Sequence, residues 1–276
     1  MKKIIALFSL LILCCSLTVG LSAVPAKAAD SKEVLILMYH CIVNNGDKKD
    51  TYIITPEQLE NDIKYLIDHN YQIVAANDLI AYAEGKISLG DRIAVLTFDD
   101  GFYNNYKYAV PLFEKYNVKG VFAVVGSYAD DEKLSGNKTS RYAYMDWTDI
   151  ERAYSSNFVE IASHSYNMHK STGRIGMKKR KNETNQSYRS LIENDILTND
   201  RKLTEICGKK PTVFAYPFGL YNSISEQVLK ENGYLVTLTC NEGKSKIYDL
   251  DSLRLLKRYN RDGKLSTQAF MKKVNA

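Results

Sequence analysis

Cysteine is scarce in this sequence, and its distribution excludes two kinds of protein. Only 5 of the 276 residues are cysteines, and Cys14 and Cys15 lie in an apolar segment close to the start of the chain. The other three allow at most one internal disulfide bond, so a disulfide framework does not hold the fold together. Their spacing does not resemble a zinc site either. We expect Cys41, Cys207 and Cys240 to be buried, unreactive thiols.

A strong excess of charge is also missing. The 37 basic and 32 acidic side chains give a net charge of +5, which is too small to indicate nucleic-acid binding or strong attraction to a membrane surface. No G-x-G-x-x-G motif and no P-loop follow any apolar segment, which argues against nucleotide binding. The sequence has no internal repeat and no interdomain linker, and it implies no protein partner.

The first 28 residues are typical of an export signal. Two lysines precede an apolar stretch over residues 4–24, and residues 26–28 (Ala-Lys-Ala) have the small-x-small pattern that signal peptidase prefers. We therefore expect cleavage before Ala29 and a domain over residues 29–276 that is secreted or associated with the cell wall. Loss of the three lysines in the signal lowers the net charge from +5 to +2. The alternative is an uncleaved membrane anchor, because the apolar stretch is nearly long enough to span a bilayer.

Apolar and helical segments alternate through the rest of the sequence. Seven apolar segments predict buried strands, at residues 34–39, 71–76, 93–98, 121–125, 158–163, 212–216 and 234–239. Predicted helices separate them, among others at residues 79–84, 109–116, 147–154, 187–206 and 225–231. This alternation predicts one α/β domain with a parallel sheet covered by helices. The number of strands favours a closed or nearly closed barrel over an open doubly wound sheet.

Residues suited to chemistry follow the predicted strands. Asp99 and Asp100 come directly after the third strand, His164 and His169 follow the fifth, and His40 ends the first. The carboxyl ends of parallel strands meet at one edge of a sheet or barrel, where active sites of α/β folds form. We therefore expect these five side chains to converge.

The residue types indicate a metal site. Neighbouring carboxylates at a strand end repel each other, so the pair is best explained if a cation neutralises one and the other faces substrate, although Asp-Asp-Gly alone also suits an acidic turn. Histidines five residues apart would diverge on a helix, at roughly 500° of rotation, so a loop must bring them together. Two imidazoles and one carboxylate are typical of catalytic zinc and of non-haem iron oxygenases. The second carboxylate favours hydrolysis, because water activation requires a base.

Three motifs resemble those of the polysaccharide deacetylases, carbohydrate esterase family four, which contain the NodB homology domain. Residues 97–102 (TFDDGF) look like the first motif, residues 164–169 (HSYNMH) the second and residues 215–219 (AYPFG) the third. The resemblance extends over about residues 33–260. It implies a NodB-like fold, which is a distorted (β/α)7-type barrel, and an enzyme that hydrolyses N-acetyl groups of a polysaccharide.

The resemblance also implies residue roles. Asp99 would be the general base, and Asp100, His164 and His169 would bind a divalent metal, usually Zn²⁺. The backbone N–H of Phe218 would stabilise the oxyanion of the tetrahedral intermediate, because the preceding residue is a proline and has no N–H.

The sequence departs from the family pattern in three places. The histidines are usually four residues apart, and Met168 makes the gap five, which resembles the branch that deacetylates poly-β-1,6-N-acetylglucosamine, a biofilm exopolysaccharide. Ala215 stands where many members have an arginine that orients the base, and Arg258 is our candidate to replace it. The late Leu-x-His motif that donates a proton is absent. We expect His40 to act as the general acid, since histidine titrates near neutrality.

Three residues are candidates for contact with the sugar. Tyr166 lies between the two histidines, Trp147 is the only tryptophan and follows a tyrosine-rich loop, and Arg258 is the third. For Trp147, packing in the core is an equal alternative. Residues 170–181 are strongly basic and predict either a solvated loop or a contact with an anionic cell-wall polymer.

The sequence leaves the substrate open. We expect an N-deacetylase of a GlcNAc polymer, with biofilm exopolysaccharide first, peptidoglycan second and chitin oligomers third. An O-acetyl esterase acting on acetylxylan would use the same attack on carbon. A non-catalytic wall-binding module would usually have lost the base or a ligand, and all four residues are present. An iron oxygenase would be revealed by metal analysis.

Overall fold

A computed structural model describes residues 30–44 and 50–276. The expected signal peptide, residues 1–28, lies outside these residues, so its cleavage stays a prediction. Within the described ranges, no helix has both the length and the apolar composition needed to cross a membrane.

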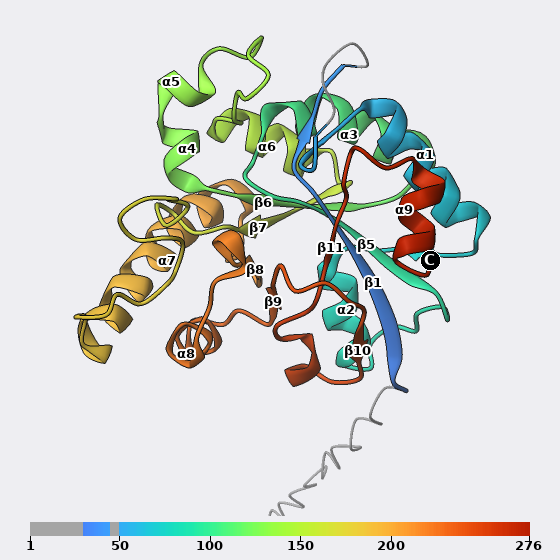
Figure 1. The fold of residues 1–276 in the computed structure, drawn as a ribbon. Helices are drawn as coiled ribbons and strands as arrows, with labels where there is room; N and C mark the ends of the chain where they lie inside the picture. Colours follow the sequence, from blue (N-terminus) through green and yellow to red (C-terminus); the bar gives the residue numbers. More distant parts are fainter. Residues whose placement is uncertain (1–29, 45–49) are drawn as a thin grey trace, which may run out of the picture.

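A curved sheet of nine strands forms the centre of the molecule (Figure 1). Its strands are β1 (Lys32–Tyr39), β4 (Gln72–Ile73), β5 (Ile93–Phe98), β6 (Gly120–Val124), β7 (Val159–Ser163), β8 (Val213–Ala215), β9 (Val236–Leu238), β10 (Ser245–Ile247) and β11 (Tyr259–Asn260). The main order is β10-β1-β5-β6-β7-β8-β9, with β4 paired to β5 and β11 paired to β1. All pairs are parallel except β1 with β10. Two short strands, β2 (Cys41–Ile42) and β3 (Ile53–Ile54), pair separately.

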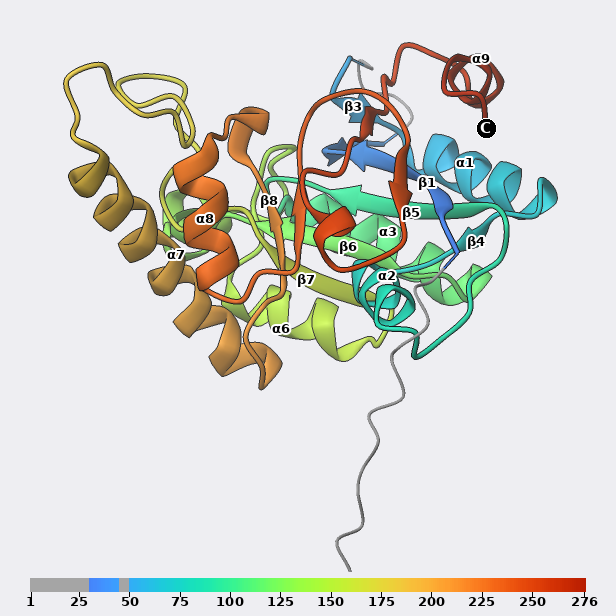
Figure 2. The same cartoon turned by 90° about the horizontal axis from the view of Figure 1, so that it is seen from below.

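Helices cover the outside of the sheet. They are α1 (Pro56–Asp68), α2 (Ala76–Ala83), α3 (Tyr103–Tyr116), α4 (Gly126–Asp130), α5 (Glu132–Ser135), α6 (Trp147–Ser155), α7 (Asn185–Cys207), α8 (Ser223–Glu231) and α9 (Thr267–Lys273), with single 3-10 turns at Pro217–Gly219 and Asp251–Leu253. As Figures 1 and 2 show, α7 and α8 lie side by side at one end of the molecule and α9 packs on α1 at the other.

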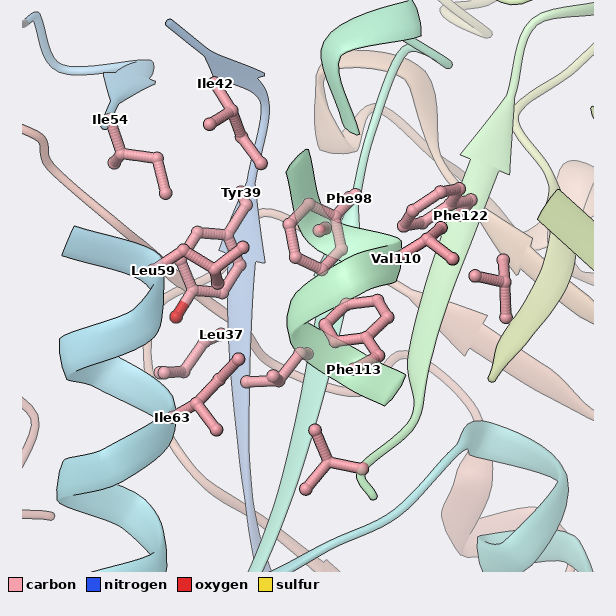
Figure 3. Packing of buried hydrophobic residues seen from close by; sticks show 14 of the residues in the cluster. Leu37, Tyr39, Ile42, Ile54, Leu59, Ile63, Phe98, Val110, Phe113 and Phe122 are labelled. Carbon is pink, nitrogen blue, oxygen red and sulfur yellow. The ribbon is translucent and has the colours of Figure 1, made fainter. Parts of the chain in front are cut away.

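The strands divide their side chains between two cores. On β1, Leu35, Leu37 and Tyr39 pack in a cluster with α1, α3 and α6, whereas Val34 and Ile36 pack with alternate residues of the other strands. Successive side chains of a strand point to opposite faces, so the first cluster lies under the helices and the second fills the interior of the barrel. Figure 3 shows the first cluster, where α1 and α3 lie against β1 and β5.

A segment near the C-terminus closes the gap between β9 and β1. Leu256 forms a parallel bridge with Leu238, and its carbonyl accepts the N–H of Thr239 at 2.9 Å. The N–H of Arg258 then donates to the Asn241 carbonyl at 2.9 Å, before β11 pairs with β1. The expected distorted barrel is therefore confirmed, and its closure places Arg258 at the mouth of the barrel.

Some boundaries differ from expectation. The expected strand at residues 71–76 is reduced to Gln72–Ile73, because residues from Ala76 form α2, whose start is capped when the Asp78 carboxylate accepts the N–H of Ala75 at 2.8 Å. The helix expected at residues 109–116 begins already at Tyr103. Its first turns are polar and lack apolar periodicity, so the sequence pattern did not reveal this earlier start. The short strands β10 and β11 were not predicted, because each has only two or three residues.

Candidate active site

A cavity of about 590 Å³ opens at the carboxyl ends of the central strands. Six residues singled out in the sequence line it: His40, Asp99, Asp100, His164, His169 and Phe218. Most of the others were not singled out from the sequence; they are Met38, Cys41, Asp50, Tyr52, Ile53, Phe102, Tyr142, Cys240, Glu242 and Asn260. They come from β1, β2, β3 and β11 and from the segments before β3, after β5, before α6 and after β9. The closed barrel brings these segments together.

Asp99 follows β5 and forms a two-pronged ion pair with Arg258. The two terminal guanidinium nitrogens donate to the two carboxylate oxygens at 2.7 and 2.8 Å. Arg258 is fully buried and also donates to the Thr239 carbonyl at 2.8 Å and to Thr97 Oγ1 at 3.1 Å. Burial alone would raise the pKa of Asp99, but the charges of Arg258 and His164 hold it below its usual value. The carboxylate is therefore ionised and able to accept a proton.

Asp100, His164 and His169 form a three-residue cage of ligand atoms that could hold a cation. Their ligand atoms all lie within 4.8 Å of one another, and Asp100 Oδ1 is 3.5 Å from His164 Nε2 and 3.0 Å from His169 Nε2. This oxygen is buried and has no hydrogen-bond partner among the described residues, a state that a bound cation would relieve.

The Nδ1 atoms of both histidines have hydrogen-bond partners, which leaves the two Nε2 atoms free to bind a metal. His164 Nδ1 lies 2.7 Å from the carbonyl of Ala215, which can only accept, so Nδ1 carries the proton. Tyr128 donates its hydroxyl proton to the His169 carbonyl at 2.8 Å and lies 3.2 Å from His169 Nδ1. Its oxygen can then accept a proton from that nitrogen. Both Nε2 lone pairs therefore face Asp100, the orientation that metal-binding histidines need, and the residues present fit a divalent cation.

Three residues of this site have left-handed backbone conformations. Asp100 has φ 71°, Ser165 has φ 70° and Phe218 has φ 56°, and such conformations cost about 1–3 kcal/mol each and persist only where their surroundings enforce them. Gly219, at φ 66°, is required as glycine because a Cβ there would lie 2.7 Å from Cys240 Cβ. Strain of this kind is typical of functional sites.

Comparison with known sequences identifies the family. A family model described as "Polysaccharide deacetylase" matches residues 86–237, which is more than half of the chain. The chain belongs to the polysaccharide deacetylase family. Among its relatives, a poly-β-1,6-N-acetyl-D-glucosamine N-deacetylase of Escherichia coli K12 is 25% identical over 236 residues, 79% of this chain and 35% of that protein. The chain thus spans about a third of the length of that relative.

A further relative and two solved structures extend the comparison. The protein with the same name from Staphylococcus epidermidis is 22% identical over 205 residues, 74% of this chain and 66% of that protein. A de-N-acetylase from Aggregatibacter actinomycetemcomitans superposes with a TM-score of 0.75 at 23% identity, over 87% of this chain and 99% of that one. A Streptococcus pyogenes deacetylase determined with acetate gives a TM-score of 0.70 at 17% identity, over 88% and 98%. These similarities show the fold.

Arg258 differs from the family pattern in its origin. The family arginine expected at position 215 is Ala215 here, and Arg258 reaches Asp99 from the segment that closes the barrel. Arg258 is a candidate both for orienting the base and for binding substrate. Arg258 is fully enclosed and is absent from the cavity lining formed by the described residues, so its position suits the first role and not the second.

His40 and Phe218 both line the cavity. His40 Nδ1 is buried and, within the described chain, has no hydrogen-bond partner; its ring meets that of Tyr52 edge-on at 4.9 Å. Burial lowers the pKa of His40, so its neutral imidazole is favoured and has to take up a proton before it can donate one. The ring of Phe218 stacks on that of His169 at 4.4 Å between centroids and remains 41% exposed.

The other two residues expected to contact sugar lie elsewhere. Tyr166 and Trp147 both donate to the carboxylate of Asp130, at 2.8 and 2.7 Å, and Lys202 binds the same carboxylate at 2.9 Å. Neither aromatic residue is among those that line the cavity in the described ranges. Among the described residues, the exposed aromatic side chains that do line it are Tyr52, Tyr142 and Phe218.

The basic stretch, residues 170–181, contacts the cavity edge at one residue. A Cβ on Gly176 would lie 2.7 Å from the Pro217 carbonyl and 3.2 Å from a ring carbon of Phe218, which lines the cavity. Cys41 is buried as expected, but the expectation was wrong for Cys207 and Cys240, which are only partly buried because they lie at a helix end and a strand end. Burial still raises the pKa of Cys207 to about 11 and that of Cys240 above its usual value, so both thiols stay protonated near neutral pH.

Proposed function

We propose that the chain is a secreted or cell-wall-associated, metal-dependent hydrolase that removes N-acetyl groups from GlcNAc residues of a polysaccharide. The observation that carries the proposal is one cavity that holds an ionised Asp99, fixed by Arg258, beside the cage of Asp100, His164 and His169. The names of the E. coli and S. epidermidis relatives support poly-β-1,6-N-acetylglucosamine as the first substrate to test. Peptidoglycan is the second.

The cage supports Zn²⁺ as the resident metal. Asp100, His164 and His169 would hold it, since two imidazoles and a carboxylate with open positions are typical of catalytic zinc. Bound there, the cation supplies a Lewis acid that polarises a carbonyl group and lowers the pKa of water.

The remaining residues account for the proton transfers of amide hydrolysis. Asp99 takes a proton from the attacking water as its oxygen bonds to the acetyl carbon, and the carbonyl oxygen becomes an oxyanion that accepts a hydrogen bond from the Phe218 N–H. The C–N bond then breaks while His40 donates a proton to the leaving nitrogen. The products are a free amine and acetic acid, which ionises to acetate. The proton held by Asp99 passes through solvent to His40, and this restores both groups. Arg258 keeps the base ionised before the attack and holds it in place throughout.

Acetate release tests this proposal. The mature domain, residues 29–276, is incubated with Zn²⁺ and poly-β-1,6-N-acetylglucosamine, peptidoglycan or acetylxylan, beside Asp99→Asn and a chelator-treated sample. We expect release from the first polymer and a loss of about 10²–10⁴-fold in Asp99→Asn, which retains the cage and therefore its metal. Release of acetate from acetylxylan alone would show that the chain is an O-acetyl esterase and not an N-deacetylase. A protein that binds metal and releases nothing would favour the wall-binding module.

A further inference from the structure

The two histidines of the cage are joined by a loop that needs external support. Residues 165–168 form neither helix nor strand, and Ser165 at φ 70° turns the chain sharply after His164. Within the loop, Ser165 Oγ accepts the N–H of Met168 at 3.1 Å. The segment that leads from His164 to His169 can therefore bring the second histidine back to the cage only if neighbouring elements hold its other polar groups.

Asp195 on α7 supplies that support at the centre of the loop. Its Oδ1 accepts the N–H of Tyr166 and its Oδ2 accepts the N–H of Asn167, each at 2.8 Å. Each carboxylate oxygen thus holds one of two successive backbone donors. Hydrogen bonds from N–H groups to an ionised carboxylate are about twice as strong as neutral ones. The pair fixes both the position and the direction of this backbone.

The same helix also holds the residue before the loop. Asn199, one turn after Asp195, donates from Nδ2 to Ser163 Oγ at 2.9 Å, and Ser163 directly precedes His164. Residues one turn apart lie on the same face of a helix. This face of α7 therefore fixes the end of β7 and the middle of the loop at a set spacing.

The opposite side of the loop is held by the start of α4. Gly126 donates its N–H to the Ser165 carbonyl at 3.2 Å, and Ser127 donates to the Tyr166 carbonyl at 2.7 Å. A Cβ on Gly126 would lie 2.3 Å from Asn199 Oδ1, so the two supports are in direct contact. The loop is clamped between α4 and α7.

We propose that Asp195 is a positioning residue that sets the separation of His164 Nε2 and His169 Nε2, and thereby the affinity of the cage for a divalent cation. The inference rests on the proposed function, because it assumes that the cage binds a metal. Asp195 is not a ligand, since the cation-binding group found among the described residues comprises only Asp100, His164 and His169. Its role is exerted through the backbone between the two histidines.

Metal binding by the full chain tests the proposal. Affinity for Zn²⁺ is measured by competition with a chromophoric chelator, and the visible spectrum of bound Co²⁺ reports the ligand geometry. The variants are Asp195→Ala, Asp195→Asn and Glu193→Ala. The last removes the same charge from α7 two residues earlier, on a different face of the helix. Unfolding midpoints with chelator show which variants are folded at the temperature of measurement.

We expect Asp195→Ala to lower Zn²⁺ affinity by about 10–100-fold, as changes in groups that orient metal ligands do, and to alter the Co²⁺ spectrum. Asp195→Asn keeps one acceptor and should lose less, and Glu193→Ala should match the wild type. If Asp195→Ala does not fold, the isosteric Asp195→Asn decides. If the folded Asp195 variants have wild-type Zn²⁺ affinity and a wild-type Co²⁺ spectrum, the role of Asp195 is overturned and the proposed function is not. A wild-type chain that binds no metal would overturn the proposed function together with it.

Discussion

Asp99 and Asp100 are neighbours in the chain, yet their carboxylates face opposite kinds of partner. Asp99 is paired with a guanidinium group that never loses its proton, so it stays ionised without being a metal ligand. Asp100 faces two imidazole nitrogens, which offer lone pairs. Because Asp100 has a left-handed backbone conformation, the carboxylates of these two successive residues point into different surroundings.

Arg258 should act on turnover and not on metal binding. Arg258→Lys keeps the positive charge but cannot form the two-pronged contact with Asp99. We expect kcat to fall about 100-fold, the typical result of displacing a catalytic group by about 1 Å, while Zn²⁺ affinity stays unchanged because Arg258 touches no cage residue. Arg254→Lys, which alters an arginine paired with Glu226, is the control. An unchanged kcat in Arg258→Lys would remove Arg258 from the mechanism.

The role of His40 can be separated from general damage by the choice of leaving group. An amine leaves only with a proton, whereas p-nitrophenolate leaves without one. His40→Gln should therefore lose about 10²–10⁴-fold in kcat on an N-acetylated oligosaccharide and lose far less on p-nitrophenyl acetate. Equal losses on both substrates would show that His40 supports the site and donates no proton.

At the scale of elements, the sequence predicted what depends on local pattern. Continuous apolar runs identified the strands, and residues directly after a strand could be placed at its carboxyl end, as for Asp99 and His164. Contacts between distant segments carried no signal in the local pattern. Asp195 meets Tyr166 across 29 residues and was not predicted, whereas the contact of Arg258 with Asp99 across 159 residues was expected only from the family resemblance. Tyr166 lies beside the cage in sequence, but the left-handed turn at Ser165 directs it to Asp130 instead.

The amino-terminal end of β7 carries the half-buried acid Glu160, which links this strand to α2. Its Oε2 accepts the N–H of Asn77 at 3.0 Å, while Oε1 is buried with no partner in the described chain. Burial raises the pKa of Glu160 to about 7 from the ordinary value of 4.5. The folded state therefore holds this proton more tightly than the unfolded state does, and stability is lost as the pH rises from about 4.5 through about 7.

Glu160→Gln removes that loss. We expect the free energy of unfolding of the wild type to fall between pH 5 and pH 8 by as much as about 3 kcal/mol relative to the variant. Urea unfolding at both pH values, with chelator present, measures the difference. Glu151→Gln, at an exposed position of α6, serves as the control. Parallel pH dependence of the wild type and Glu160→Gln would contradict the assignment.

At the scale of the whole molecule, the final segment both closes the barrel and completes the site. Arg258 lies three residues before Arg261, whose guanidinium group donates to the Asp62 carboxylate of α1 at 2.7 and 3.1 Å. Tyr39 and Thr267 also donate to that carboxylate, at 3.2 and 2.6 Å. Both charged side chains are fully buried. The segment that carries Arg258 is thus tied to the first helix by a buried ion pair.

Removing one member of the Asp62–Arg261 pair should lower the free energy of unfolding more than removing both. Arg261→Met leaves the Asp62 carboxylate buried without its counter-charge, and Asp62→Leu does the same to Arg261, so each should lower the free energy of unfolding by about 3–5 kcal/mol. The double variant leaves no lone buried charge and should recover much of that loss. Urea unfolding of the four proteins, arranged as a double-mutant cycle, measures the coupling. Losses that simply add would show that the C-terminal segment is held by apolar packing of α9 on α1, with the ion pair contributing little.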